Sequence, residues 1–381
     1  MRQRPDGRWE ARITQGYDSG TGKQVRKSLY GSTQAEVLKK MREMQTAIDT
    51  GSYIEPQKMR VSSWLDIWYK EYTSSNRSNT RYGYNVNIES HIKPAIGNIP
   101  LQKLQKHDIM TFANMLLNEK GLSPKTIKNI HGTLHVALEQ AVENGIIHSN
   151  PASLGKKSKL PKVERKEMNY LDDKQLPIFL KEIQGKVYED LYYVDVFTGM
   201  RKGEITGLTW DDVDFENGTI SVYKQLIFDK FNSTYSFQPL KTDKPRKITP
   251  APIVIQRLKE VEIKQKENKI ALGSAWKNDM NLVFTQADGS HLTFTTVNKT
   301  LKRRTENIAG TGKIRFHDLR HTFVANARQS GMDWKDISEM LGHATVAFTM
   351  DVYGHLSETM TRHSADLMEQ YIDSLTKNKK A

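Results

Sequence analysis

Residues 317–321 read His-Asp-Leu-Arg-His, and this stretch says more about the fold than any other in the chain. His317 and Arg320 are one helical turn apart, so on a helix their side chains project from the same face. Leu319 and Phe323 would occupy another face and suit a hydrophobic core. The stretch therefore predicts a helix that is packed on one side and presents a histidine and an arginine on the other.

Other polar motifs surround this helix in the sequence. After it come Leu-Gly-His at 341–343 and Tyr-Gly-His at 353–355. Before it, Thr-Gly-Met-Arg at 198–201 precedes Glu204, and an arginine and a glutamate at that spacing can simply pair on a helix surface. Between these motifs, 240–244 reads Leu-Lys-Thr-Asp-Lys in a strand-rich region. A packed core does not need all of these phosphate-compatible side chains, so they indicate a site for an anionic substrate.

Taken in order, these motifs resemble those of the tyrosine recombinase (phage integrase) family, and the resemblance spans essentially the whole catalytic half. It implies six catalytic residues: Arg201, Lys241, His317, Arg320, His343 and, as the nucleophile, Tyr353. All six positions follow the family pattern, which implies an active enzyme. The sequence leaves open which lysine acts, because Lys244 and Lys247 lie close to Lys241.

The chemistry of DNA cleavage explains the choice of residue types. A phosphodiester under attack spreads negative charge over its non-bridging oxygens, which the always-charged guanidiniums of Arg201 and Arg320 can clamp. A tyrosine phenol has a reference pKa of about 10, so Tyr353 needs proton removal or nearby positive charge to attack at neutral pH. His317 is the candidate base or proton shuttle, because histidine titrates near neutrality.

The family resemblance supplies the remaining roles. Lys241 would act as the general acid toward the departing 5′ oxygen, and His343 would donate a hydrogen bond to the phosphate. The expected product is a 3′-phosphotyrosine with a free 5′-hydroxyl, which then attacks the linkage of the partner strand. Since the covalent bond conserves the energy of the phosphodiester, neither ATP nor any other cofactor is expected.

The composition favours the same class of partner. Lys and Arg total 57 against 44 Asp and Glu, and the formal net charge of +13 favours a polyanion, double-stranded DNA first. The absence of cysteine excludes disulfide frameworks, thiolate zinc sites and cysteine nucleophiles, and it fits a reducing cytoplasm. The N-terminal residues lack the apolar stretch of a secretory signal, so we expect a cytoplasmic, nucleoid-associated protein with no membrane partner.

The chain is expected to be multidomain. Residues 1–55 predict a small α+β domain, a three-stranded sheet plus a helix, which resembles the arm-binding domains of phage and conjugative-transposon integrases. Apolar residues at helical spacing predict an all-α unit at 58–155, which resembles the family's core-binding domain. Residues 156–168 predict a basic linker. Residues 169–381 predict a mixed, mainly α catalytic domain with a small antiparallel sheet and a C-terminal docking helix.

Four basic residues flank or lie on the predicted N-terminal strands. They are candidate DNA contacts, because small sheets can enter a DNA major groove: Arg8, Arg12, Arg26 and Lys27. A solvated strand face would account for the same residues. The resemblance further implies a homotetramer that integrates, and also excises, a mobile element at core and arm attachment sites. An excisionase and a host DNA-bending protein are candidate partners.

Three other interpretations are open at the level of sequence. His317, His321 and His343 could hold a zinc ion, although this leaves both arginines and the tyrosine unexplained. Residues 329–353 could form the helix-turn-helix of a non-catalytic DNA-binding regulator. A type IB topoisomerase would share the cleavage chemistry, and only assembly and exchange between paired sites would distinguish it.

Overall fold

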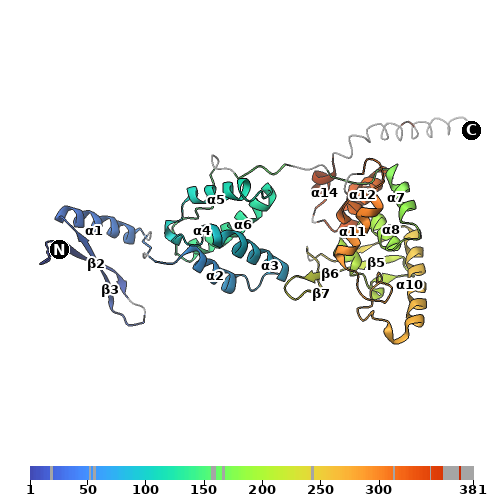
Figure 1. Ribbon diagram of the computed structural model, residues 1–381, viewed down its shortest axis with the longest axis horizontal. Coiled ribbons are helices and arrows are strands. Elements are labelled where there is room, and N and C mark those ends of the chain that lie inside the picture. The colour runs from blue at the N-terminus through green and yellow to red at the C-terminus, as the bar shows by residue number, and fades with distance from the viewer. Residues whose placement is uncertain are drawn as a thin grey trace, which may run out of the picture. The chain divides into compact units, whose positions relative to one another are not determined.

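The chain divides into two compact units, Met1–Glu164 and Arg165–Ala381, whose elements are labelled in Figure 1. The computed structural model describes residues 1–354 and 369, apart from 18–19, 51–52, 55–56, 156–159, 165–167, 242–243, 312–313 and 344. The predicted docking helix, from Ser357 onward, lies outside the described residues. Of the helices within these residues, none combines the length and apolar character needed to cross a membrane.

A three-stranded antiparallel sheet and one helix open the first unit. These elements are β1 (Arg2–Gln3), β2 (Trp9–Tyr17), β3 (Gln24–Gly31) and α1 (Gln34–Asp49), with β2 in the middle of the sheet. The Thr33 side chain accepts a hydrogen bond from Glu36 N and caps the start of α1. Ala11 and Ile13 of β2 and Val37 of α1 are buried where the helix covers the sheet.

Helices make up the rest of the first unit. They are α2 (Val61–Tyr72), α3 (Ser78–Asn87), a π-helical turn (Ile88–Ile92), α4 (Lys93–Ile96), a 3-10 turn (Leu101–Lys103), α5 (Lys106–Asn118) and α6 (Pro124–Glu143). Trp64 and Trp68 are buried, and Trp64 Nε1 donates a hydrogen bond to the Ala137 carbonyl oxygen. These two tryptophans of α2 therefore belong to the hydrophobic core. The prediction of an all-α unit is confirmed.

The second unit is mainly helical, as predicted, and has two small antiparallel sheets where one was expected. Its helices are α7 (Gln175–Ile183), α8 (Glu189–Thr198), α9 (Lys202–Thr206), α10 (Pro252–Leu272), α11 (Phe294–Thr305), α12 (Phe316–Gln329), α13 (Trp334–Leu341) and α14 (Val346–Tyr353). Its strands are β4 (Val213–Asp214), β5 (Thr219–Val222), β6 (Lys224–Asp229), β7 (Thr234–Pro239) and β8 (Arg246–Ile248). β5 pairs with β4 and β8, while β6 and β7 form a separate hairpin.

Two glycines make the turns that bring the polar motifs to α12. Gly199 ends α8 at a φ of 61°, and an added Cβ would lie 2.5 Å from the Phe323 ring of α12. Gly342 ends α13 at a φ of 65°, and an added Cβ would lie 2.9 Å from the Arg246 side chain. Because the left-handed conformation and the lack of space both exclude a side chain, only glycine fits at these two helix ends.

Candidate active site

The N-terminal half of α12 is anchored by buried hydrogen bonds. The fully buried Asp318 carboxylate accepts from Arg315 N at 2.7 Å and from the Arg315 guanidinium at 2.8 Å. Thr322 Oγ1 donates to the Asp318 carbonyl oxygen and accepts from Leu171 N, each at 2.9 Å. These bonds fix the rotation of α12 and thus the direction in which Arg320 projects.

Arg320 joins the first and last polar motifs. Its side chain is 1% exposed and donates hydrogen bonds to the Gly199 carbonyl at 2.7 Å and the Leu341 carbonyl at 2.8 Å. Its Nη2 also lies 2.9 Å from Nε2 of His343. Burial, reinforced by the charge of Arg201, lowers the pKa of Arg320 to about 9, so the guanidinium is still charged at neutral pH. The fold therefore holds a desolvated cation in one fixed position.

Glu204 holds the second arginine. Arg201 Nη1 donates to Glu204 Oε1 at 2.8 Å, as the spacing of these two residues predicted. Arg246 Nη2 donates to Glu204 Oε2 at 2.7 Å, and Arg246 Nε donates to the Met340 carbonyl. Burial raises the pKa of Glu204, but the bonds and charges of Arg246 and Arg201 outweigh burial and hold that pKa at about 2. Glu204 is thus a buried anion that orients two guanidiniums.

Three histidines belong to this cluster and are neutral at physiological pH. Burial lowers the pKa of His317, lowers that of His321 to about 4 and lowers that of His343 to about 3. Nδ1 of His343 lies 2.8 Å from Thr349 Oγ1, while its Nε2 meets Arg320. Both ring nitrogens of His343 are therefore engaged, and its ring orientation is fixed.

Tyr353 ends α14 inside the same cluster. The residue is 2% exposed, and its hydroxyl oxygen lies 2.8 Å from Nδ1 of His321. Burial raises the pKa of Tyr353, while the charges of Arg320 and Arg201 oppose that rise. The structure thus brings together five of the six predicted residues within one chain: Arg201, His317, Arg320, His343 and Tyr353.

The sixth predicted residue, Lys241, lies apart from these contacts. It is exposed in the connection between β7 and β8, next to residues 242–243, which lie outside the described part of the chain. Lys244 and Lys247 are exposed as well. The geometry does not single out one of the three, so the identity of the acting lysine stays a prediction.

The N-terminal candidates divide between the two faces of the sheet. Arg12 and Arg26 are exposed, and Arg8 lies in the turn before β2, where it pairs with Asp6 at 2.8 Å. Lys27 pairs across the strands with the buried Ile13, so its side chain leaves the sheet on the helix-covered face.

The Lys27 ammonium donates a hydrogen bond to Tyr53 Oη at 2.9 Å. Arg12 and Arg26 therefore share an outward face that Lys27 does not share. The opposite faces of Arg26 and Lys27 follow from their consecutive positions on one strand, but which of the two shares the face of Arg12 depends on the register of β2 and β3.

A basic cavity of about 730 Å³ opens beside the cluster, and its cationic lining was not predicted. Lys202, Lys299, Lys302, Arg315 and His317 contribute to its wall. Four of these five residues are lysine or arginine, and such a lining suits a phosphate backbone. His317 thus faces both the buried cluster and an open, cationic space.

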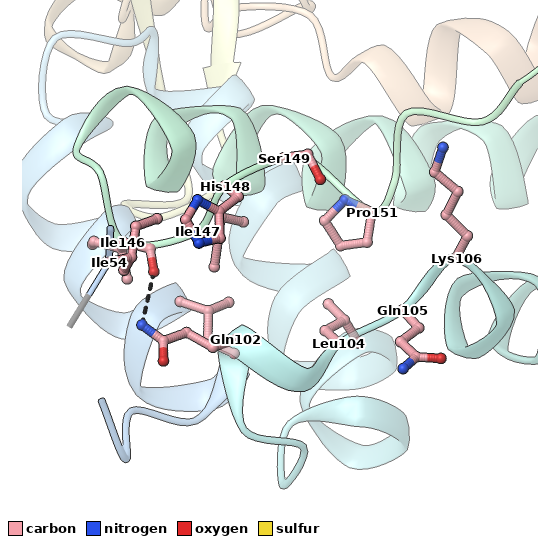
Figure 2. A pocket seen from close by; sticks show the side chains of 11 residues that line it. Ile54, Gln102, Leu104, Gln105, Lys106, Ile146, Ile147, His148, Ser149 and Pro151 are labelled. Carbon is pink, nitrogen blue, oxygen red and sulfur yellow. Dashed lines mark hydrogen bonds between the residues drawn. The ribbon is translucent and has the colours of Figure 1, made fainter. Parts of the chain in front are cut away.

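A second cavity, of about 480 Å³, lies in the helical part of the first unit and is shown in Figure 2. Ile147, His148 and Pro151 line one side of it, opposite Gln102 and Leu104. None of the six candidate residues lines it, and its mixed apolar and polar wall does not define a chemistry.

Two further residues of the cluster were missed from the sequence. Arg246 shares Glu204 with Arg201, and no spacing rule connects it to that glutamate. The fully buried Asp195 has no hydrogen-bond partner for its carboxylate among the described residues. Burial raises the pKa of Asp195 well above its ordinary value, although the charge of Arg320 opposes the rise. The packing of α8 on α12 reveals Asp195, and the packing of β8 against α13 reveals Arg246.

Comparison with known proteins decides the family. The profile of the Phage integrase family matches residues 169–360, and that of the phage integrase N-terminal SAM-like domain matches residues 61–117. The chain belongs to the phage integrase family. This integrase is 29% identical over 364 residues to the protein named Tyrosine recombinase XerC-like of Caldanaerobacter subterraneus subsp. tengcongensis, covering 90% of this chain and 91% of that protein. It is 25% identical to the ICEBs1 integrase of Bacillus subtilis, with 96% and 98% of the two chains covered.

Solved structures agree with this membership. The Tn1549 transposon integrase, in complex with transposon right end DNA, is 25% identical, with a TM-score of 0.67, and covers 82% of this integrase and 100% of that chain. A lambda integrase dimer bound to a core site is 19% identical, with a TM-score of 0.56 over 77% of this chain and 95% of that one, and it shares the fold. The resemblance seen in the motifs and the predicted fold are confirmed, and the protein is a site-specific recombinase of the tyrosine type.

The rival interpretations fit the geometry less well. In the described part of the chain, no three His, Asp or Glu side chains are arranged to hold a metal ion. His343 and His321 instead contact Arg320 and Tyr353. The family membership does not favour a non-catalytic helix-turn-helix regulator, and α13 and α14 pack on α12 with Tyr353 buried between them.

Proposed function

We propose that this recombinase integrates and excises a mobile genetic element through a 3′-phosphotyrosine intermediate. One observation carries the proposal: the Tyr353 hydroxyl lies in a buried cluster with the cationic Arg320 and the neutral His321. The names of the relatives support the mobile element, since they include the ICEBs1 integrase and the transposase from transposon Tn916.

The proposed cleavage step follows from charge and geometry. Arg201 and Arg320 would clamp the scissile phosphate, and His343 would donate a hydrogen bond to it. Tyr353 would then attack phosphorus, and a lysine, Lys241 in our proposal, would protonate the departing 5′ oxygen. A preorganised set of donors stabilises the charge that develops in such a transition state, and each donor typically contributes a factor on the order of 10²–10³ to the rate.

The proposed partner is double-stranded DNA with core and arm attachment sites. The basic cavity beside His317 supports backbone contacts near the cleavage site. The outward arginines of the N-terminal sheet, Arg12 and Arg26, support a second contact at arm sites. The Tn1549 integrase has been solved with circular intermediate DNA, and lambda integrase as a tetramer on a Holliday junction. By analogy we propose a homotetramer on DNA in the nucleoid, assisted by an excisionase and a host DNA-bending protein.

A suicide substrate tests the covalent step. A duplex nicked next to the cleavage site loses its short 5′-hydroxyl fragment after cleavage, so the covalent complex is trapped. We expect the wild type to form a protein–DNA adduct that resists denaturation, with a chelator present, and Tyr353→Phe to form none. Adducts at wild-type yield with Tyr353→Phe would refute the proposal. Exchange between two paired sites then separates a recombinase from a topoisomerase-like strand cleaver.

A further inference from the structure

His321 is a direct hydrogen-bond partner of the Tyr353 hydroxyl. Nδ1 of His321 lies 2.8 Å from the hydroxyl oxygen, and the two ring centroids are 5.4 Å apart. The two residues are 9% and 2% exposed, so water competes little for this contact. From the sequence, His321 had stood out only as half of a metal-binding spacing.

The neighbouring histidine has a different environment. His317 stacks edge-on against His321, with 4.8 Å between ring centroids, and it also lines the basic cavity. Within the described part of the chain, His317 makes no hydrogen bond to Tyr353. The two histidines of the His-Asp-Leu-Arg-His stretch therefore face different groups: one faces the open cationic space and the other faces the nucleophile.

We propose that His321, rather than His317, accepts the proton of the Tyr353 hydroxyl when the tyrosine attacks DNA. The inference rests on the function proposed above and names a further catalytic residue for it. His321 qualifies as catalytic because its nitrogen touches a reacting atom.

The protonation state of His321 suits this role. The titratable and charged groups that face it are His317, Asp318, Arg315 and Arg320, together with Tyr353 from α14. Burial first, and then His317, keep the pKa of His321 at about 4, so the ring is neutral at pH 7. A neutral imidazole has one acceptor nitrogen, and the tyrosine hydroxyl can donate to it.

Bound DNA makes His321 a stronger base. A phosphodiester carries one negative charge, and when it sits between the guanidiniums it favours the protonated form of a nearby imidazole. The pKa of His321 therefore rises from about 4 toward the ordinary value for histidine once substrate is bound. The base is neutral before attack and becomes a better proton acceptor at the moment when it is needed.

The step balances as follows. A lone pair of the Tyr353 hydroxyl oxygen forms the new bond to phosphorus, and the proton of that hydroxyl moves to Nδ1 of His321. The bond between phosphorus and the 5′ oxygen breaks, and the 5′ oxygen takes a proton from the general acid. Religation reverses these transfers, so His321 returns the proton to the tyrosine as the 5′-hydroxyl attacks.

The test compares two asparagine variants of the full chain on the nicked duplex, His321→Asn and His317→Asn. The asparagine side-chain oxygen can occupy roughly the place of Nδ1 and accept the hydrogen bond, but it cannot take the proton. We expect His321→Asn to cleave about 100-fold more slowly in a single turnover, with DNA affinity and melting temperature close to wild type. The rate of this variant should recover about tenfold per pH unit between pH 7 and 9, as more tyrosine ionises.

A duplex with sulfur at the bridging 5′ position separates base from acid. A thiolate leaves without protonation, so this substrate rescues a variant that lacks the acid and does not rescue one that lacks the base. Failure of sulfur to rescue His321→Asn supports the proposal. Three results would each overturn the proposal. They are rescue of His321→Asn by the sulfur substrate, a cleavage rate of His321→Asn within about threefold of wild type, and recovery of the cleavage rate at high pH in His317→Asn alone.

The wild-type pH–rate profile gives a test that needs no variant. If His321 is the base, the cleavage rate should level off by about pH 7.5. The pKa of His321 with DNA bound lies between about 4 and the ordinary value of about 6.5, so above pH 7.5 the ring is already fully neutral. A rate that climbs tenfold per pH unit beyond that point would mean that hydroxide takes the proton, which overturns the inference. The absence of any wild-type adduct would instead overturn the proposed function itself.

Discussion

Arginines have opposite environments in the two units of the molecule. In the N-terminal sheet, Arg12 and Arg26 are exposed, and each bonds a side chain two residues away on its own strand, Glu10 and Gln24. In the second unit, Arg320 is 1% exposed and donates to two backbone carbonyls. The first kind of arginine can move to meet a ligand. The second kind is fixed before any ligand arrives.

Burial explains why fixed arginines belong where bonds are broken. Removing a guanidinium from water is costly, and the fall of the Arg320 pKa to about 9 reflects that cost. In return, a donor that is already oriented needs no reorganisation as the charge of the transition state develops. Exposed arginines lack this property, but they suit affinity, because they release counterions from the DNA backbone.

The largest effect is expected for Arg320→Lys. A lysine keeps the charge but lacks the planar fork that reaches the Gly199 and Leu341 carbonyls together, so the cation loses its fixed position. Single-turnover cleavage of the nicked duplex should fall by a factor on the order of 10²–10³, with little change in DNA affinity. The matched control is Arg12→Lys, which should cleave a core-site duplex at the wild-type rate. Equal cleavage rates for Arg320→Lys and Arg12→Lys would mean that the fixed position of a buried arginine does not matter for cleavage.

A smaller effect is expected from acid. In the unfolded chain His321 and His343 have pKa values of about 6.5, whereas in the folded chain these values are about 4 and about 3. Between these limits the unfolded state binds more protons, so the stability of the second unit falls as the pH drops from about 7 to about 4. Calorimetry should show its melting temperature falling by on the order of 10–20 °C. The melting temperature of His343→Gln should fall less over the same pH range, because this variant lacks one titrating ring. An equal fall would mean that other groups cause the loss of stability.

The sequence sufficed where function requires a residue type at a fixed spacing. The order of motifs led to the family, and the periodicity of apolar residues led to the all-α unit. It failed where contacts join distant segments. Arg246 meets Glu204 across 42 positions, and His321 meets Tyr353 across 32 positions. Such pairs follow from how α12, α13 and β8 pack, which no local pattern encodes.

The sheet register gives the smallest and most selective prediction. Arg12 and Arg26 share the outward face of the N-terminal sheet, whereas Lys27 pairs with Ile13 and donates to Tyr53 on the helix-covered face. If the outward face contacts DNA phosphates, Arg12→Gln and Arg26→Gln should each reduce the salt dependence of arm-site binding by about one unit of slope, and core-site cleavage should not change. Lys27→Gln carries the same loss of charge and should leave the slope unchanged, because the Lys27 side chain lies on the helix-covered face of the sheet. Binding titrations across a range of salt concentrations measure all three variants. An equal effect of Lys27→Gln would mean that net charge, rather than one face of the sheet, determines arm-site affinity.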